Sequence, residues 1–207
     1  MRTPVVERFG DSALRARLEA DVDGASLLTA LRGLPGVVDA VVTERHALVV
    51  VEGEPGSLET EFTRAIAAAP RARSTPGALH TVQVRYDGED LEEVARAASL
   101  DVAAVIAAHA APTYVVATLG FLPGFAYLRG LDPRLVLPRR STPRPRVPAL
   151  AVAIAGPYAG VYPFASPGGW HLLGTAVGFA PFDATRGAAL ALGHRVRFEP
   201  APGQRGG

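Results

Sequence analysis

From residue 112 onward the chain consists of short apolar runs that glycine and proline separate, and this spacing is the strongest constraint on its fold. Runs of this length suit strands, because helices of globular proteins need longer periodic segments. Several short strands with turn residues between them predict a closed β-barrel or a β-sandwich. The runs occupy residues 113–119, 149–155, 160–162, 170–173 and 194–198.

The first third of the chain has a different pattern, in which helices alternate with strands. Leu27, Leu31 and Leu34 recur at helical spacing, and Pro35 ends their run. The order strand, strand, helix, strand, strand, helix predicts a small α+β sandwich with its helices on one antiparallel sheet. The expected strands cover residues 5–9, 13–18, 37–42 and 47–51, and the expected helices cover 25–34 and 58–69.

A polar, arginine-bearing stretch at residues 70–79 has the composition of a linker between domains. We place the domain boundary near residue 78, so the α+β domain takes residues 1–78 and a mainly-β domain takes residues 79–200. The other predictions are a strand at 81–86, helices at 90–99 and 102–109, and a disordered Pro/Gly-rich tail at 201–207.

Composition excludes several classes of chemistry. The chain has neither cysteine nor lysine, so all 21 basic residues are arginine. Disulfides, thiolate nucleophiles, Schiff bases and the lysine of a phosphate-binding P-loop are therefore excluded. The net charge of +1 lacks the basic excess that nucleic-acid or anionic membrane surfaces favour. With no apolar stretch long enough for a bilayer and no secretory signal, we expect a cytoplasmic protein without nucleic-acid or membrane partners.

Three segments dense in glycine, proline and aromatic residues could carry a binding site. In such loops the backbone amides can approach a ligand closely. The same composition also suits tight barrel turns whose aromatic side chains fill the core, so both interpretations stay open. The segments are residues 120–128, 138–144 and 166–170.

The middle segment carries Arg139, Arg140 and Arg144, which the interspersed prolines would hold apart. Arginine binds carboxylate or phosphate groups through two parallel hydrogen bonds. A small anionic molecule, the phosphates of ATP or an acidic partner surface would each suit such a cluster. A solvated, charged face is the alternative interpretation.

The five histidines stand singly, without the spacing of metal ligands, so we expect no metal site. His109 is the exception in position, since it lies at the end of a predicted helix just before Pro112. A base or hydrogen-bond donor there could reach a ligand at the mouth of a barrel. Stabilisation of the helix end by its dipole is the simpler alternative. No serine lies in the Gly-x-Ser-x-Gly setting of a hydrolase nucleophile.

Long motifs run through the second half of the chain, including PRR at residues 138–140 and SPGGW at residues 166–170. Together they resemble the family of bacterial 5-oxoprolinase B subunits, whose members are also called allophanate hydrolase subunit 1 or KipI-type proteins and carry a carboxyltransferase domain. The resemblance implies that the mainly-β domain is a cyclophilin-like barrel following the α+β domain. The other motifs cover residues 109–114, 120–128, 130–134, 143–144, 147–148, 152–156 and 160–163.

The resemblance also implies an activity and partners. It implies that the chain is one member of a complex that hydrolyses 5-oxo-L-proline to L-glutamate with ATP. The chain would be inactive alone. It would work with a homologous C subunit, of the allophanate hydrolase subunit 2 type, and with an A subunit. The alternatives are a KipI-type inhibitor of a histidine kinase, or one component of an allophanate- or urea-related amide hydrolase or carboxyltransferase. In this interpretation His109 and Arg140 are catalytic. The residues expected to bind substrate or anion are Arg139, Arg144, Tyr127, Tyr162, Ser166, Gly168, Gly169 and Trp170.

Three departures from the family pattern bear on activity. An arginine usually follows Gly174, where this chain has Thr175. Leu150 stands where the pattern usually has glycine, and the glutamine often found near Tyr158 is missing. If these positions touch substrate or partner, we expect altered substrate choice or lost activity.

Overall fold

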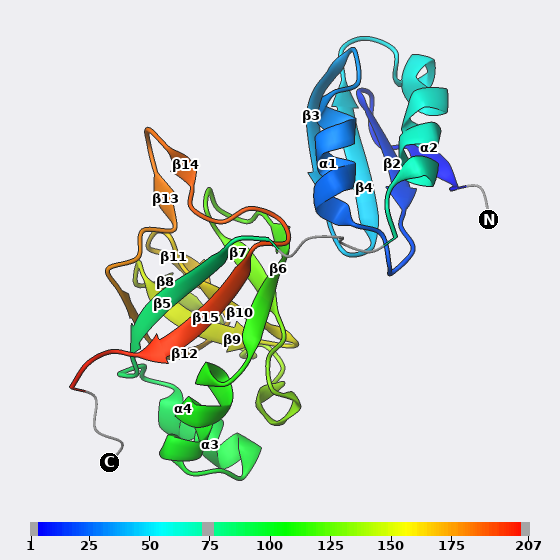
Figure 1. The fold of residues 1–207 in the computed structure, drawn as a ribbon. Helices are drawn as coiled ribbons and strands as arrows, with labels where there is room; N and C mark the ends of the chain where they lie inside the picture. The colour runs from blue at the N-terminus through cyan, green and yellow to red at the C-terminus, as the bar shows by residue number, and fades with distance from the viewer. Residues whose placement is uncertain (1–3, 72–76, 204–207) are drawn as a thin grey trace. The chain divides into compact units, whose positions relative to one another are not determined.

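The computed structural model describes residues 4–71 and 77–203, and the chain divides into two compact units between Pro76 and Gly77 (Figure 1). Residues 72–76 of the expected linker and residues 204–207 of the expected tail lie outside the described residues. Ala201, at the start of that tail, donates its N–H to the Val84 carbonyl, so this residue is bound to the barrel. No helix within the described parts is long and apolar enough to span a bilayer.

The first unit holds one antiparallel sheet in the order β1-β2-β4-β3 together with two α-helices. Asp23 caps the first helix by accepting from the Ala25 N–H, and Leu27 and Leu31 of that helix are buried. Phe62 of the second helix is buried as well. The elements are β1 Val6–Arg8, β2 Ala13–Arg17, α1 Gly24–Arg32, β3 Val37–Val42, β4 His46–Val51, the 3₁₀ turn η1 Pro55–Leu58 and α2 Glu59–Ala68.

The second unit is built around a closed seven-stranded barrel in the order β10-β7-β6-β15-β5-β12-β9, which confirms the predicted barrel. Strand β15 runs parallel to β5, from Arg195 opposite Leu79 to Pro200 opposite Val84, whereas the other barrel neighbours pair antiparallel. The barrel strands are β5 Leu79–Arg85, β6 Thr113–Leu119, β7 Ala126–Arg129, β9 Ala151–Ala155, β10 Tyr158–Val161, β12 His171–Val177 and β15 Arg195–Pro200.

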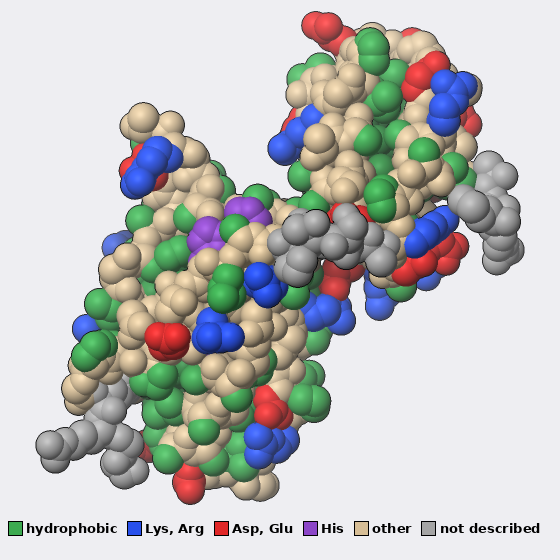
Figure 2. All heavy atoms as spheres, viewed as in Figure 1, with side chains coloured by type: hydrophobic (Ala, Val, Ile, Leu, Met, Phe, Trp, Pro, Cys, Tyr) green, Lys and Arg blue, Asp and Glu red, His purple; other side chains and the backbone are tan. Residues whose placement is uncertain are grey.

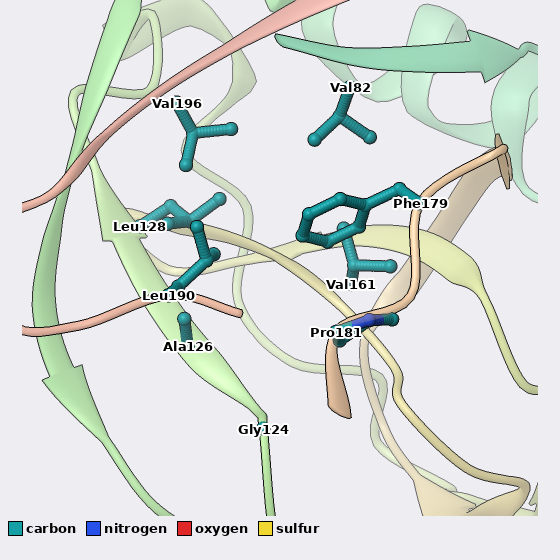
Figure 3. A pocket seen from close by; sticks show the side chains of 9 residues that line it. All are labelled: Val82, Gly124, Ala126, Leu128, Val161, Phe179, Pro181, Leu190 and Val196. Atoms are coloured by element: carbon teal, nitrogen blue, oxygen red, sulfur yellow. The ribbon is translucent and has the colours of Figure 1, made fainter. Parts of the chain in front are cut away.

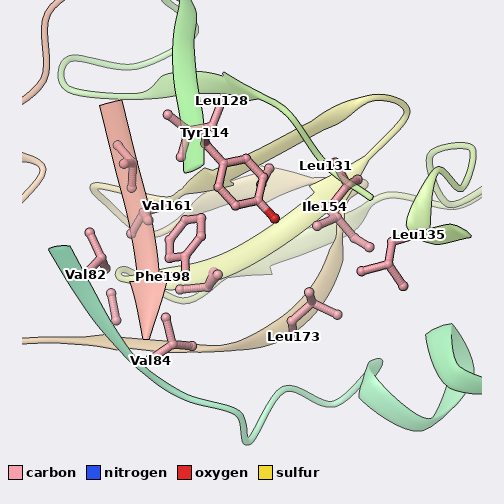
Figure 4. Packing of buried hydrophobic residues seen from close by; sticks show 14 of the residues in the cluster. Val82, Val84, Tyr114, Leu128, Leu131, Leu135, Ile154, Val161, Leu173 and Phe198 are labelled. Atoms are coloured by element: carbon pink, nitrogen blue, oxygen red, sulfur yellow. The ribbon is translucent and has the colours of Figure 1, made fainter. Parts of the chain in front are cut away.

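Helices α3 (Leu91–Ala98) and α4 (Val102–Ala110) cover one end of the barrel (Figure 1). The barrel core is apolar, and its side chains point inward from all around the wall (Figure 4). Figure 3 shows a space that this packing leaves near Phe179, a cavity of about 10 Å³ with apolar lining. A cavity that is only as large as one water molecule and offers no hydrogen-bond partners stays dry, so this cavity is not a ligand site.

Several short elements are not expected from the sequence. The segments at residues 120–128 and 166–170, predicted as loops, contain β7 and the short strand β11. β11 pairs with β8, and each of these two strands contains a proline, which an isolated two-stranded ribbon accommodates. The remaining elements are β8 Arg144–Val147, β11 Ser166–Gly168, the 3₁₀ turn η2 Pro133–Leu135, and the hairpin of β13 Phe182–Asp183 with β14 Gly187–Ala188.

Candidate functional site

The three Gly/Pro/aromatic segments meet at a pocket of about 230 Å³ on the second unit, which we call the aromatic pocket. Tyr127 reaches it from β7, and Tyr162 reaches it from the end of β10. Six of the ten residues predicted for the site line it. The lining consists of Phe121, Phe125, Tyr127, Arg139, Pro143, Tyr162, Pro167, Gly168, Gly169 and Trp170.

The aromatic rings of the pocket hold one another in edge-to-face contacts. Phe125 lies 5.4 Å from Trp170 and 5.3 Å from Tyr162, measured between ring centroids. Tyr127 lies 5.7 Å from Trp170. Such pairs each stabilise by about 0.5–1.5 kcal/mol beyond area burial, so these contacts hold the apolar wall together without a ligand. Phe121, which is 58% exposed, stands at the rim.

Tyr162 supplies a polar group that keeps its proton. Burial raises the pKa of Tyr162 to about 12, although the nearby charges of Arg139 and Arg144 lower it. The phenol is therefore neutral at physiological pH and serves as a hydrogen-bonding group. Gly168 lies directly against it, and a Cβ built on Gly168 would overlap the Tyr162 hydroxyl. A glycine is required at this position to keep the wall in place.

The three candidate arginines separate into two groups. Arg139 is exposed and lines the pocket, and no carboxylate among the described residues pairs with it. Arg140 and Arg144 instead bind Asp90, which lies beside α3 and is 2% exposed. Arg140 donates to Asp90 Oδ1 over 2.9 Å, and Arg144 donates to the same oxygen over 2.6 Å. Asp90 Oδ2 accepts the backbone N–H of Leu172 over 2.7 Å.

We call this group the Asp90 cluster: Asp90, Arg140, Arg144, Glu89, Glu93 and the N–H of Leu172. Glu93 lies 2.9 Å from Arg140, and Glu89 lies 3.3 Å from Arg144. Three carboxylates thus face two guanidinium groups and compensate their charge, although Arg140 Nε and Arg144 Nη1 have no hydrogen-bond partner among the described residues. The side chain of Arg140, which is predicted to be catalytic, does not line the pocket.

The Asp90 cluster instead ties together the two segments that form the pocket wall. The backbone N–H of Arg140 donates to the Gly169 carbonyl over 2.8 Å. His171 Nε2 lies 2.9 Å from the Pro138 carbonyl. With Asp90 holding Leu172 as well, the segment that carries Arg139 and the segment that carries Trp170 are held in register. Asp90 is the residue that sequence reasoning missed.

His109, which is predicted to be catalytic, does not lie at the aromatic pocket. Its ring is fully buried, stacks on Phe198 with centroids 4.6 Å apart, and shares one hydrogen bond, between Nδ1 and the Tyr86 hydroxyl at 2.8 Å. Nε2 has no hydrogen-bond partner among the described residues. Burial lowers the pKa of His109 to about 3, so the ring is neutral. His109 does not line the aromatic pocket, because its helix covers the barrel end and its side chain enters the core.

The remaining predicted positions lie outside the pocket. The Ser166 hydroxyl donates to the Pro167 carbonyl over 3.3 Å, and Ser166 is not part of the lining. Thr175, which replaces the family's arginine, donates to Asp87 Oδ1 over 3.0 Å. Arg85 binds the other oxygen of Asp87 and lies directly opposite Thr175 in the strand pair. A guanidinium group therefore stands beside this carboxylate without an arginine at position 175.

ATP is the group that the resemblance implies for the complex, and the residues predicted for its phosphates do not fit it. Arg140 and Arg144 are neutralised by the Asp90 cluster, which leaves Arg139 as the one arginine in the pocket lining. A pocket of about 230 Å³ is also smaller than the roughly 300–1,000 Å³ usual for drug-sized ligands. Arginine and acidic side chains are interspersed on the face shown in Figure 2, which displays no field of a single sign.

Residues 4–191 match the family described as "Carboxyltransferase domain, subdomain C and D". The 5-oxoprolinase B subunit of Escherichia coli O157:H7 is 36% identical over 208 residues, which cover 93% of this chain and 94% of that protein. The 5-oxoprolinase B subunit of Bacillus subtilis (strain 168) is 50% identical over 96 residues, which cover 45% of this chain and 40% of that protein.

Solved structures show the same relationship. The crystal structure of TTHA0988 aligns with a TM-score of 0.82 at 39% identity, over 94% of this chain and 41% of that chain. The present chain therefore spans about two-fifths of the length of TTHA0988. Urea carboxylase of Kluyveromyces lactis aligns over 96% of this chain and 22% of that chain, with a TM-score of 0.75 at 18% identity, a likeness of fold alone. The family match and the identity to the E. coli protein together show that the chain belongs to the family "Carboxyltransferase domain, subdomain C and D". Within this family it belongs to the group of 5-oxoprolinase B subunits.

Proposed function

We propose that the chain is the B subunit of a complex that hydrolyses 5-oxo-L-proline to L-glutamate with ATP, together with a homologous C subunit and an A subunit, and is inactive alone. Relatives named as 5-oxoprolinase B subunits support this proposal, one of them along nearly its whole length. The observation in the structure that carries it is the aromatic pocket, a small site with apolar walls and one cationic side chain.

The residues of the pocket suit binding and orientation of a substrate. Hydrolysis adds water across the lactam C–N bond, so the product has a free amine and a second carboxylate. Among the lining residues the titratable groups are Arg139, Tyr127 and Tyr162, and Tyr162 holds its proton up to about pH 12. A group that could take a proton from water near pH 7 is thus expected from elsewhere in the complex. ATP is likewise assigned to one of the partners, since the arginines predicted for its phosphates and the aromatic pocket do not fit it.

The proposal is tested by ATP-dependent glutamate release from 5-oxo-L-proline. The chain is co-purified with its candidate C and A subunits, and each of the three is then omitted in turn. We expect release by the full set and none when this chain is left out. A well-formed complex that releases no glutamate, or one that works equally well without this chain, contradicts the proposed function.

Gly168→Ala is expected to raise the KM of the assembled complex for 5-oxo-L-proline by roughly tenfold, because the new methyl group displaces the Tyr162 ring and narrows the pocket. Steady-state kinetics at varied 5-oxo-L-proline measure the effect. Gly33→Ala is the matched control, since its Cβ meets only ordinary contacts at 3.5 Å at the end of α1. Equal KM values for the two variants would argue against a substrate role for the pocket.

A further inference from the structure

We propose that the aromatic pocket itself binds 5-oxoproline, and that Arg139 is the specificity-determining residue, which pairs with the ligand's carboxylate. This proposal rests on the proposed function and assigns the substrate to a defined place on this chain. It also implies that the pocket excludes the nucleotide and binds the uncharged lactam ring only weakly. The geometry of the pocket supports each part.

The charge of the pocket lining indicates that the ligand is an anion. Arg139 is the one charged side chain in the lining, and no acidic side chain lines the pocket. Aromatic walls alone would also suit an organic cation, but a guanidinium group at the same site repels one. Because no described carboxylate pairs with Arg139, its donors remain available for a planar anion. A carboxylate is the small planar group that a guanidinium binds through two parallel hydrogen bonds.

The volume of the pocket and its apolar lining indicate the uncharged part of the ligand. The pocket of about 230 Å³ has walls formed by five aromatic rings and two prolines. Apolar walls of this kind bury a small carbon ring, and they leave no room for a base, a ribose and three phosphates together. Tyr127, Tyr162 and Trp170 carry the uncharged side-chain groups of the lining that could hydrogen-bond to a lactam amide. A five-membered lactam with one carboxylate matches the size, shape and charge of the site.

Preorganisation distinguishes Arg139 from an ordinary surface arginine. Its neighbour Arg140 is fixed twice, by the side-chain bonds to Asp90 and Glu93 and by the backbone bond to Gly169. The backbone at Arg139 is thereby held beside the wall that contains Trp170. A backbone that is held in place before binding loses less conformational freedom when the ligand arrives, so only the side-chain torsions of Arg139 remain to be ordered. This arrangement gives the Asp90 cluster a part in ligand selection without contact to the ligand.

The test uses Trp170, which is the chain's only tryptophan and lines the pocket. Its fluorescence is titrated with L-5-oxoproline, 2-pyrrolidinone and ATP in the full-length chain. We expect saturable change with L-5-oxoproline, and much weaker binding of 2-pyrrolidinone, which has the same ring without the carboxylate. Arg139→Ala should weaken L-5-oxoproline binding roughly tenfold to a hundredfold, the range for hydrogen bonds to a charged group.

Two controls isolate the site. Arg146→Ala removes the same charge from an exposed position on β8 that does not line the pocket, and it should bind L-5-oxoproline as the unmodified chain does. Trp170→Phe should remove the signal. 2-Pyrrolidinone should bind Arg139→Ala and the unmodified chain alike, since it offers nothing for Arg139 to hold.

The outcomes separate this proposal from the proposed function. No response to L-5-oxoproline, equal loss in Arg139→Ala and Arg146→Ala, or competition by ATP at the same site would each overturn the pocket assignment. An active complex whose KM for 5-oxo-L-proline is unchanged by Arg139→Ala would overturn it too, while leaving the complex a 5-oxoprolinase. Conversely, Arg139-dependent binding by a chain whose complete complex releases no glutamate would retain the site and overturn the proposed function.

Discussion

Replacing Asp90 with alanine is expected to lower the free energy of unfolding of the second unit by about 3 to 5 kcal/mol, the cost of breaking a buried ion pair by removing one partner. Asp90 is 2% exposed, and both of its oxygens are used. Its loss leaves the Arg144 guanidinium, which is only 16% exposed, facing Glu89 alone at 3.3 Å. The N–H of Leu172 loses its acceptor as well.

Urea denaturation followed by Trp170 fluorescence measures the effect, because this tryptophan lies in the second unit beside the Asp90 cluster. Asp87→Ala is the matched control. Asp87 also pairs with an arginine, but its side chain is 42% exposed, so its removal should cost less than about 1 kcal/mol. Similar midpoints for the two variants would show that the Asp90 cluster is not a stabilising element.

The second large effect concerns pH and His109. Burial lowers the pKa of His109 to about 3 in the folded chain, whereas an unfolded histidine titrates near 6.5. Below pH 6.5, His109 therefore binds a proton in the unfolded state but not in the folded state. The free energy of unfolding falls as the pH drops from about 6.5 towards 3. The difference amounts to about 2 kcal/mol between pH 7 and pH 5. Above pH 7 the group makes no further contribution.

Urea denaturation at pH 7 and pH 5 measures this loss in the unmodified chain and in His109→Gln, which cannot take up the proton. The unmodified chain should lose about 2 kcal/mol more than the variant between the two pH values. His46→Gln, at an exposed position of the first unit, should leave the loss unchanged. A second measurement needs no variant, since the His109 ring signals in NMR should not titrate between pH 8 and pH 5. Titration near pH 6.5 would contradict the buried, neutral ring.

The barrel can be predicted from the sequence because its longer strands carry continuous apolar runs. Strands β9 and β12 are mostly buried, and both fall within or next to apolar runs of the sequence. The two-stranded ribbon of β8 and β11 cannot be predicted in this way. Its strands are short and contain proline, and most of their side chains are exposed or half-buried, so no alternation marks them.

The wall of the pocket is easier to predict than its electrostatics. Glycine, proline and aromatic residues gathered in three segments indicate the wall, and those segments do meet. The pairing of Arg140 and Arg144 stays hidden, because Asp90 lies about fifty positions earlier in the chain at the start of a helix. An aspartate there suggests a helix cap, yet Asp90 makes no side-chain cap hydrogen bond, since both oxygens face other partners. Long-range ion pairs leave no local periodicity to detect.

For His109 the backbone is predictable and the side chain is not. The sequence places it at a helix end, and α4 does end at Ala110. The direction of the side chain cannot be predicted, because helix α4 is apolar almost throughout and gives no polar face to orient it. The packing of Phe198 and Tyr114 against the ring decides its direction, and these residues come from strands later in the chain.

The parallel pairing of β15 with β5 constrains the order in which the protein can mature on the ribosome. These strands join residues 79–84 to residues 195–200, so the barrel cannot close until its last strand has left the exit tunnel. The sheet of the first unit has all its strands within the first 51 residues, so it can form while the rest is being translated. During that interval the nascent β5 and β6 lack the strand that joins them.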